Sequence, residues 1–336
     1  MKPLVIRSAL DAIATVPYLL GFHPSRSLVV IGFDGPDGTC AVRVDLPSSH
    51  SARVSALLAG NGFRRALLLA YGTPDEVTES TDAMRAALAV AGIEVAEAIR
   101  VADHRWWSLT CADACCPPEG TPYDISGSVL AAEAIFAGHV ALADRSELTD
   151  SIRPLEGLAR RSMREATRRA ERRFLAWARD GTTSFQYRSR TVEEGLTVLP
   201  RLLSAARTGS HPTDDEVAWL GFLLTELRVR DEAWVRIDEE SPTADIAFWR
   251  DILRRIEEPY AAAPASLLAF AAYAAGDGGL ANIALERALE VDPAYSMAVI
   301  LREVMAAGIP PTKARMRMTP DQLADAYQER QHRQAS

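Results

Sequence analysis

The chain has 336 residues, of which 48% are hydrophobic and 24% are charged, and its formal net charge is -8. This length favours two domains, and the ordinary globular composition excludes disorder along most of the chain. The negative charge argues against nucleic acid or an anionic membrane as partner of the whole chain, and no apolar run is long enough to span a bilayer. Arg7 and Asp11 interrupt the first apolar stretch, so a signal-peptide core is missing and we expect a cytoplasmic protein.

Strand and helix patterns alternate over the first third of the chain. Residues 8–20 follow an amphipathic helical pattern, which Gly21 and Pro24 would end. The apolar run 28–33 and the alternating run 40–46 flank turn-forming residues, and together they predict a β-hairpin. Further helices are expected over residues 51–58 and 74–90, and further strands over 66–71, 93–101 and 105–110. This alternation predicts an α/β domain over 1–125, with a mixed sheet of about five strands and flanking helices.

A segment rich in Cys, Pro and Gly covers residues 111–123, and strand patterns stop after it. Helical patterns follow over 127–143, 155–179, 191–206, 214–227 and 244–256. We therefore expect an all-α domain over 126–318, followed by a polar, frayed tail over 319–336. The end of this domain resembles a tetratricopeptide-type helical hairpin at Leu268, Ala269, Ala281, Leu285, Ala288 and Pro293, although Ala272 stands where an aromatic is expected.

Two separate motifs in the chain point to the same family. The first motif reads Val16-Pro17-Tyr18-Leu19-Leu20-Gly21-Phe22-His23-Pro24 and continues in Ser27-Leu28-Val29-Val30. The second reads Arg105-Trp106-Trp107-Ser108, followed by Cys111 and Cys115-Cys116-Pro117-Pro118-Glu119-Gly120. Both resemble the signature of an actinobacterial family known as domain of unknown function family 4192. The resemblance implies an actinobacterial source, and it supplies no activity, cofactor or catalytic residue.

The cysteine-rich segment is a candidate metal site. Cys111, Cys115 and Cys116 are close in sequence, and His104 and Cys40 are candidates for further ligands. Zinc takes four ligands, usually from two spaced pairs, and no Cys-x-x-Cys pair is present here. A redox-labile disulfide between Cys111 and Cys116, or reduced thiols packed in the turn, are the alternatives. Zinc is the one cofactor that the sequence makes conceivable, and no other cofactor is predicted.

A second candidate is a rim of the predicted sheet. His23, Ser25 and Arg26 join the first helix to the first strand, and a histidine, a hydroxyl and a guanidinium can bind a carboxylate or phosphate. Thr73 opens a helix after a central strand, and Asp45 ends the neighbouring strand, so both can line the same pocket. The alternative is that these polar groups satisfy the backbone of a loop where the helix stops.

Glu97 stands out on the strand expected at 93–101. Simple alternation places its carboxylate on the same face as Val95 and Ile99, where an unpaired charge is costly. It marks either a ligand pocket or, as we favour, a bulge or an edge position.

The helix expected at 155–179 is rich in arginine. Arg160, Arg164, Arg168 and Arg172 can contact the phosphates of a nucleic acid. The alternative is a solvated or interdomain face whose local partners are Glu156, Glu165 and Glu171. The acidity of the whole chain favours this alternative, so nucleic acid is not the expected partner.

The functional prediction rests on the absence of catalytic motifs and on the helical half of the chain. The sequence contains no convergent set of acid, base and nucleophile, and no phosphate-binding loop ending in lysine. We therefore favour a non-enzymatic interaction, scaffold or regulatory protein, whose helical half contacts another protein or a second copy. The alternatives are a small-molecule or nucleotide-binding enzyme with a pocket at the sheet rim, and a nucleic-acid binder using the arginine-rich helix.

Overall fold

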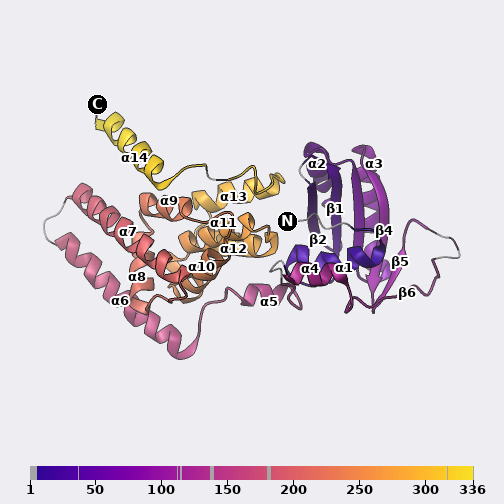
Figure 1. The fold of residues 1–336 in the computed structure, drawn as a ribbon, viewed down its shortest axis with the longest axis horizontal. Coiled ribbons are helices and arrows are strands. Elements are labelled where there is room, and N and C mark those ends of the chain that lie inside the picture. The colour runs from indigo at the N-terminus through magenta and orange to yellow at the C-terminus, as the bar shows by residue number, and fades with distance from the viewer. Residues whose placement is uncertain are drawn as a thin grey trace. The chain divides into compact units, whose positions relative to one another are not determined.

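The computed structural model describes residues 6–36, 38–111, 113, 116–136, 140–179, 183–315 and 317–335 (Figure 1). It divides into two compact units. The first, here called the α/β unit, comprises Met1–Leu148 and Met305–Pro310. The second, the helical unit, comprises Thr149–Val304 and Pro311–Ser336.

The α/β unit contains one mixed six-stranded sheet. Its strands are β1 (Ser27–Gly35), β2 (Gly38–Asp45), β3 (Arg65–Tyr71), β4 (Glu94–Ala102), β5 (Arg105–Ser108) and β6 (Thr121–Pro122). They lie in the order β2-β1-β3-β4-β5-β6, and only β3 and β4 are parallel. The five expected strands and the β1–β2 hairpin are therefore confirmed. The additional strand β6 has two residues, one of them proline, which is too short to produce a sequence pattern.

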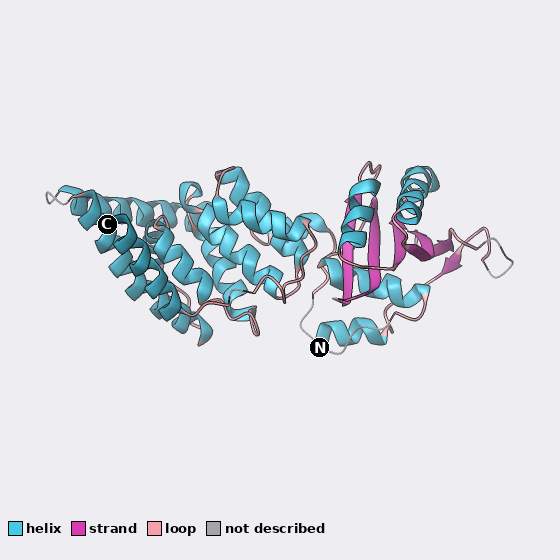
Figure 2. Cartoon of the chain, turned by 90° about the horizontal axis from the view of Figure 1, so that it is seen from above, coloured by secondary structure: helices cyan, strands magenta, loops and turns pink. Residues whose placement is uncertain are grey.

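Helices cover both faces of this sheet (Figure 2). Helices α2 (Ser51–Gly60) and α3 (Pro74–Val90) pack on the face that carries Leu28, Leu68 and Ala98. The face with Val29, Ile31, Leu69 and Ile99 is also buried, on the side of α1 (Ala9–Leu20). As expected, α1 ends at Gly21, whose φ of 80° lies in the left-handed region. Helix α3 begins with a capping box between Thr73 and Glu76 and with Pro74 in its first turn.

The α/β unit extends past the boundary expected at residue 125. Helix α4 (Val129–Phe136) packs against α1, and Leu142 forms a parallel bridge with Phe22. The unit ends within α5 (Arg145–Asp150). Of the helix expected over 127–143, the described residues are helical only over Val129–Phe136, and α5 is a further short helix beyond that range. The Asp144 carboxylate accepts hydrogen bonds from the backbone N–H groups of Ser146 and Glu147, so it starts α5 as a separate helix.

The helical unit consists of helices in the part of the chain that the structure describes. They are α6 (Gly157–Arg179), α7 (Ser184–Arg207), α8 (Asp214–Leu223), α9 (Leu227–Val235), α10 (Thr243–Arg255), a 3-10 turn (Glu258–Tyr260), α11 (Ala262–Ala274), α12 (Gly278–Val291), α13 (Ser296–Ala306) and α14 (Pro320–Ala335). The helix expected over 214–227 ends at Leu223, and α9 follows it as a helix that the sequence pattern did not separate. Capping boxes at Thr183 and Thr213 start α7 and α8.

Helices α11 and α12 form the hairpin expected near the end of the chain. Gly276 adopts a φ of 80° in the turn, and the Asp277 side chain caps α12 through the backbone N–H of Leu280. Helix α11 is buried along almost its whole length. The likeness of this hairpin to a tetratricopeptide unit stays a prediction.

The polar segment 319–336, expected to be a frayed tail, includes α14. Leu323 is buried, and the Tyr327 hydroxyl donates to Asp231 Oδ2 on α9 over 2.6 Å. Contacts of this kind hold α14 against α9, although the composition of the segment alone indicates fraying. Among the described helices of both units, none is long and apolar enough to cross a membrane.

Candidate functional site

A β-bulge determines where Glu97 lies. Val95 pairs with Ala66 and Glu97 pairs with Leu67, so Ala96 is an extra residue on β4. The insertion reverses the alternation, because Val95 packs in the core under α2 and α3 whereas Glu97 lies on the opposite face with Leu67. The expected bulge is therefore present, and it explains how a carboxylate fits into an otherwise apolar strand.

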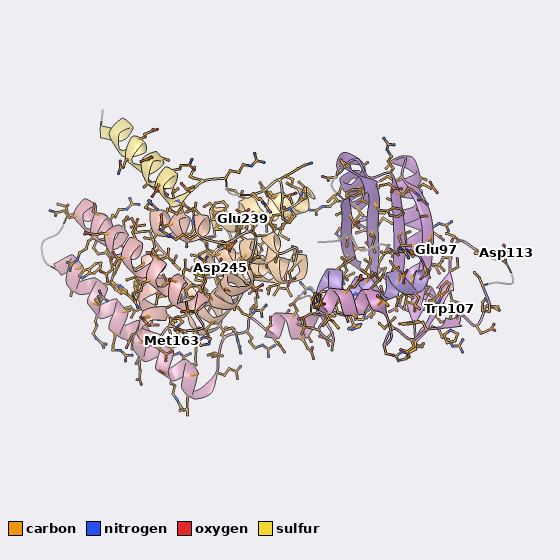
Figure 3. All side chains as sticks on the ribbon, in the orientation of Figure 1. Glu97, Trp107, Asp113, Met163, Glu239 and Asp245 are labelled. Atoms are coloured by element: carbon orange, nitrogen blue, oxygen red, sulfur yellow. The ribbon has the colours of Figure 1, made fainter. Side chains whose placement is uncertain are left out.

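Glu97 lines a pocket of about 550 Å³ on this second face. The pocket lies between the sheet and the chain that leads into α1. Its lining residues are Ile6, Arg7, Ser8, Ala9, Ile31, Phe33, Asp34, Thr39, Arg65, Leu67, Ala96 and Glu97. Figure 3 labels Glu97 on β4 within the sheet. A pocket of this size can hold a small molecule.

Two hydroxyl groups hold the Glu97 carboxylate in place. Ser108 Oγ and Thr110 Oγ1 donate to Glu97 Oε1 over 2.8 and 2.6 Å. Ser108 Oγ also accepts hydrogen bonds from the backbone N–H groups of Thr110 and Cys111, which fixes the end of β5. Both donors bind the same oxygen, and Oε2 receives no hydrogen bond from the residues that the structure describes. Glu97 therefore keeps an acceptor available for a ligand.

The charges around the pocket balance one another. Arg65 lies 3.6 Å from Asp34 and 3.6 Å from Glu94, and its guanidinium carbon is 5.1 Å from the centre of the Phe33 ring. Both ion-pair distances are longer than the usual distance of a hydrogen bond. The buried Arg65 Nε has no hydrogen-bond acceptor among the described residues. Arg7, Arg65, Asp34 and Glu97 thus line the pocket together with the apolar Ile31 and Leu67. Because its lining combines charged and apolar side chains, the pocket suits an amphiphilic molecule.

The structure brings the predicted rim residues to one end of the sheet. Ser27, which follows Arg26, pairs with Asp45 on one side and with Tyr71 on the other, and Thr73 lies two residues past Tyr71. His23, Ser25 and Arg26 are all exposed. The backbone N–H of His23 donates to the Leu142 carbonyl, so it anchors the loop to the chain after α4.

Several polar side chains at this rim already form hydrogen bonds with one another. Arg26 Nε donates to Glu76 Oε1 over 2.8 Å, and Glu76 Oε2 accepts from the backbone N–H and the hydroxyl of Thr73. The Thr73 backbone hydrogen bond and the Arg26 charge keep the pKa of Glu76 below its usual range. Arg43 donates to Asp45 over 2.5 Å. The spacing of Glu76 from Thr73 predicts its place at the start of α3, whereas its ion pair with Arg26 is not visible in the sequence. Ligand binding at the rim stays a prediction.

The predicted metal ligands are only partly described. Cys115 lies outside the described residues. His104 adopts a φ of 56° in the turn between β4 and β5, and Cys111 and Cys116 follow β5. No group of three or more metal-ligating side chains is gathered among the residues whose positions are described. Zinc binding therefore stays a prediction.

Cys40 does not belong to that cluster. It lies on β2 at one edge of the sheet, whereas β5 and β6 form the other edge. Four strand spacings of about 4.8 Å separate β2 from β5, which is too far for one metal ion. Cys40 instead packs against the core, and burial raises the pKa of its thiol.

Trp106 and Trp107 are consecutive residues on β5, so their side chains lie on opposite faces of the sheet. Trp106 pairs with Val101 and Trp107 pairs with Arg100. Trp107, which is labelled in Figure 3, has the Arg100 guanidinium 3.5 Å from a ring centroid and donates from Nε1 to the Pro118 carbonyl. A Cβ at Gly120 would lie 2.4 Å from this indole. Pro118 and Gly120 of the cysteine-rich segment thus pack against the Trp107 side chain.

The four predicted phosphate contacts on α6 divide into two pairs. Arg160 lies 3.2 Å from Glu257 and donates to the Ile256 carbonyl, so it ties α6 to the end of α10. Arg164 lies 3.9 Å from the same carboxylate. Arg168 and Arg172 are exposed, and neither has an ion-pair partner among the described residues. The structure therefore assigns a structural role to Arg160 and leaves Arg168 and Arg172 accessible.

A model of the family described as domain of unknown function (DUF4192) matches residues 10–312, which include nearly all of the α/β unit and most of the helical unit. The chain is a member of this family. Neither a curated protein nor a solved structure matches it.

Proposed function

We propose that the α/β unit binds a small amphiphilic molecule in the Glu97 pocket. The observation that carries this proposal is the fixed carboxylate, of which one oxygen is held by two hydroxyls and the other accepts no hydrogen bond from the described residues. A ligand group that donates hydrogen bonds satisfies that oxygen. Ile31, Phe33 and Leu67 also line the pocket, and they can contact the apolar part of the ligand.

An amine is the donor that this pocket favours. A hydrogen bond between an ammonium group and a carboxylate is charge-assisted and roughly twice as strong as a neutral one. The guanidinium of Arg65 already lies between Asp34 and Glu94, so Glu97 is the carboxylate that remains for a ligand cation. The lining contains hydroxyls at Ser8 and Thr39 but no histidine, cysteine or lysine among the described residues. This composition supports binding over catalysis.

The test compares three phenylalkyl probes that differ in their polar group, namely 2-phenylethylamine, 2-phenylethanol and 3-phenylpropionate. Saturation-transfer NMR titrations on the full chain measure their dissociation constants. We expect the amine to bind best, with a dissociation constant of about 1 mM, as is reasonable for so few atoms. The Glu97→Gln variant should weaken amine binding about tenfold or more and change alcohol binding little.

A matched control separates the pocket from general electrostatics. Glu79→Gln removes one exposed carboxylate from α3, on the other side of the sheet, and should leave all three affinities unchanged. Equal affinities of the amine and the alcohol for the natural chain would contradict the proposal. Equal losses in the two variants would contradict it as well.

A further inference from the structure

The arginines of α6 fall into a paired set and an unpaired set. Arg160 pairs with Glu257, Arg169 lies 2.7 Å from Asp215, and Arg173 lies 2.6 Å from Glu194. These three side chains connect α6 to its neighbours in the helical unit. Because they have carboxylate partners there, they offer little charge to anything outside.

Arg161, Arg168 and Arg172 form the unpaired set, here called the arginine stripe. All three are exposed, and none has an ion pair or a hydrogen bond among the residues that the structure describes. At 100° per residue they share the face of α6 opposite the buried Met163 and Ala166. The stripe extends over about 16 Å along the helix, given a rise of 1.5 Å per residue.

Apolar side chains stand at both ends of the stripe. Leu158 is 76% exposed and Leu175 is 55% exposed. Glu165 lies between Arg161 and Arg168 on the same face and is exposed. Figure 1 shows α6 along one edge of the helical unit. The face thus offers three positive charges between two leucines on a chain whose net charge is -8.

We propose that the arginine stripe docks an acidic amphipathic helix of a partner protein. Carboxylates on the partner satisfy the three guanidinium groups, and its apolar residues cover the two leucines. The local charge is opposite to that of the whole chain, so it selects an acidic partner and steers its approach.

Two other occupants fit this face less well. A second copy of α6 would be repelled, because the three arginines and Glu165 give each copy a net charge of +2 on this face. In the antiparallel arrangement that matches the leucines, Arg161 would meet Arg172 of the other copy, and only Arg168 would meet Glu165. A nucleic-acid backbone would neutralise the arginines, but it would leave Leu158 and Leu175 uncovered. An acidic helix matches both the charges and the apolar ends.

The experiment measures binding of a fluorescein-labelled helical peptide to the full chain by fluorescence anisotropy. The peptide carries glutamates seven and four residues apart, flanked by leucines, to match the stripe. A second peptide replaces the glutamates by glutamines, and labelled single- and double-stranded DNA serve as the competing class. We expect the acidic peptide to bind, with an affinity that falls as salt rises, and the glutamine peptide to bind about tenfold more weakly.

Matched variants locate the binding surface. The triple variant Arg161→Gln, Arg168→Gln and Arg172→Gln should weaken the acidic peptide about tenfold. A control triple variant, Arg53→Gln, Arg64→Gln and Arg302→Gln, removes the same charge from other exposed positions and should change the affinity about twofold or less. The double variant Leu158→Ser and Leu175→Ser should also weaken the peptide.

Each outcome decides the proposal. A larger loss in the stripe variant than in the control triple, together with a loss in the leucine variant, supports it. Equal losses in both triple variants, or equal binding of the two peptides, would overturn it. DNA binding that depends on the arginines but not on the leucines would assign the stripe to nucleic acid instead.

Discussion

At the scale of single residues, the role of a polar side chain in this protein depends on the partner to which it hydrogen-bonds. Glu97 is held by Ser108 and Thr110, and Glu76 joins Arg26 to Thr73. A carboxylate among apolar residues signals in the sequence that some partner must exist, because an unpaired buried charge is costly. The identity of the partner depends on strand register, which no single strand reveals.

Tyr327 illustrates the same principle with a measurable titration. Burial, the hydrogen bond to Asp231 and the Asp231 charge raise the pKa of Tyr327 to about 12. The protonated phenol is therefore favoured when α14 is docked. This contribution is fully present below pH 10, near the usual pKa of tyrosine, and is lost as the pH rises through about 12.

We predict that Tyr327→Phe loosens α14. Loss of one hydrogen bond to a partly buried carboxylate should cost about 1 kcal/mol of docking free energy, so amide exchange over residues 320–335 should accelerate about fivefold at neutral pH. The difference in tyrosinate absorbance at 295 nm between the natural chain and the variant should titrate near pH 12. A midpoint near pH 10, or unchanged exchange, would show that the hydroxyl does not hold the helix.

At the scale of helices and strands, much of the fold could be predicted because local patterns and end signals agree. The strands β1 to β5 are apolar or alternating runs, and α1 and α3 carry their own start or stop residues. The bulge at Ala96 escapes any period-two pattern, since the extra residue shows only against Ala66 and Leu67. The pocket depends on that bulge and on the fold of the chain before α1, so the sequence could name Glu97 but not its surroundings.

Close contacts between helices also cannot be predicted from the sequence, because they join residues that are far apart in the chain. Gly195 lies inside a helix that the pattern predicts, yet nothing nearby in sequence distinguishes it from a helix-weakening glycine. In the structure a Cβ at this position would lie 2.4 Å from Val229 Cγ2 on α9. Gly278, at the start of α12, has open space around the same position.

These two glycines give opposite predictions for one substitution. Gly195→Ala gains helix propensity but overpacks against Val229, so we expect a net loss of about 1–2 kcal/mol in the free energy of unfolding. Gly278→Ala should be neutral or stabilising by up to about 1 kcal/mol. Urea unfolding followed by circular dichroism measures both. In the double variant Gly195→Ala and Val229→Ala, the loss should be smaller than the sum of the single losses. A stabilising Gly195→Ala would show that α7 and α9 pack less closely.

At the scale of the whole molecule, the chain contains two separately built cores. Leu68 is fully buried in the sheet core of the α/β unit, and Leu220 is fully buried on α8 in the helical unit. The candidate small-molecule site and the arginine stripe belong to different units. If each core is cooperative by itself, damage to one should leave the other unit and its proposed binding activity intact.

Leu68→Ala and Leu220→Ala should each cost about 2–5 kcal/mol, because each leaves a cavity at a fully buried leucine. Hydrogen-exchange mass spectrometry at rising urea concentrations reports on peptides from both units within one sample. We expect Leu68→Ala to shift the transition of peptides from β1, β3 and β4 and leave those from α8 and α11 in place, and Leu220→Ala to do the reverse. A common shift of all peptides in both variants would mean that the two units unfold as one, and the amine-binding and peptide-binding tests would then need to be interpreted together.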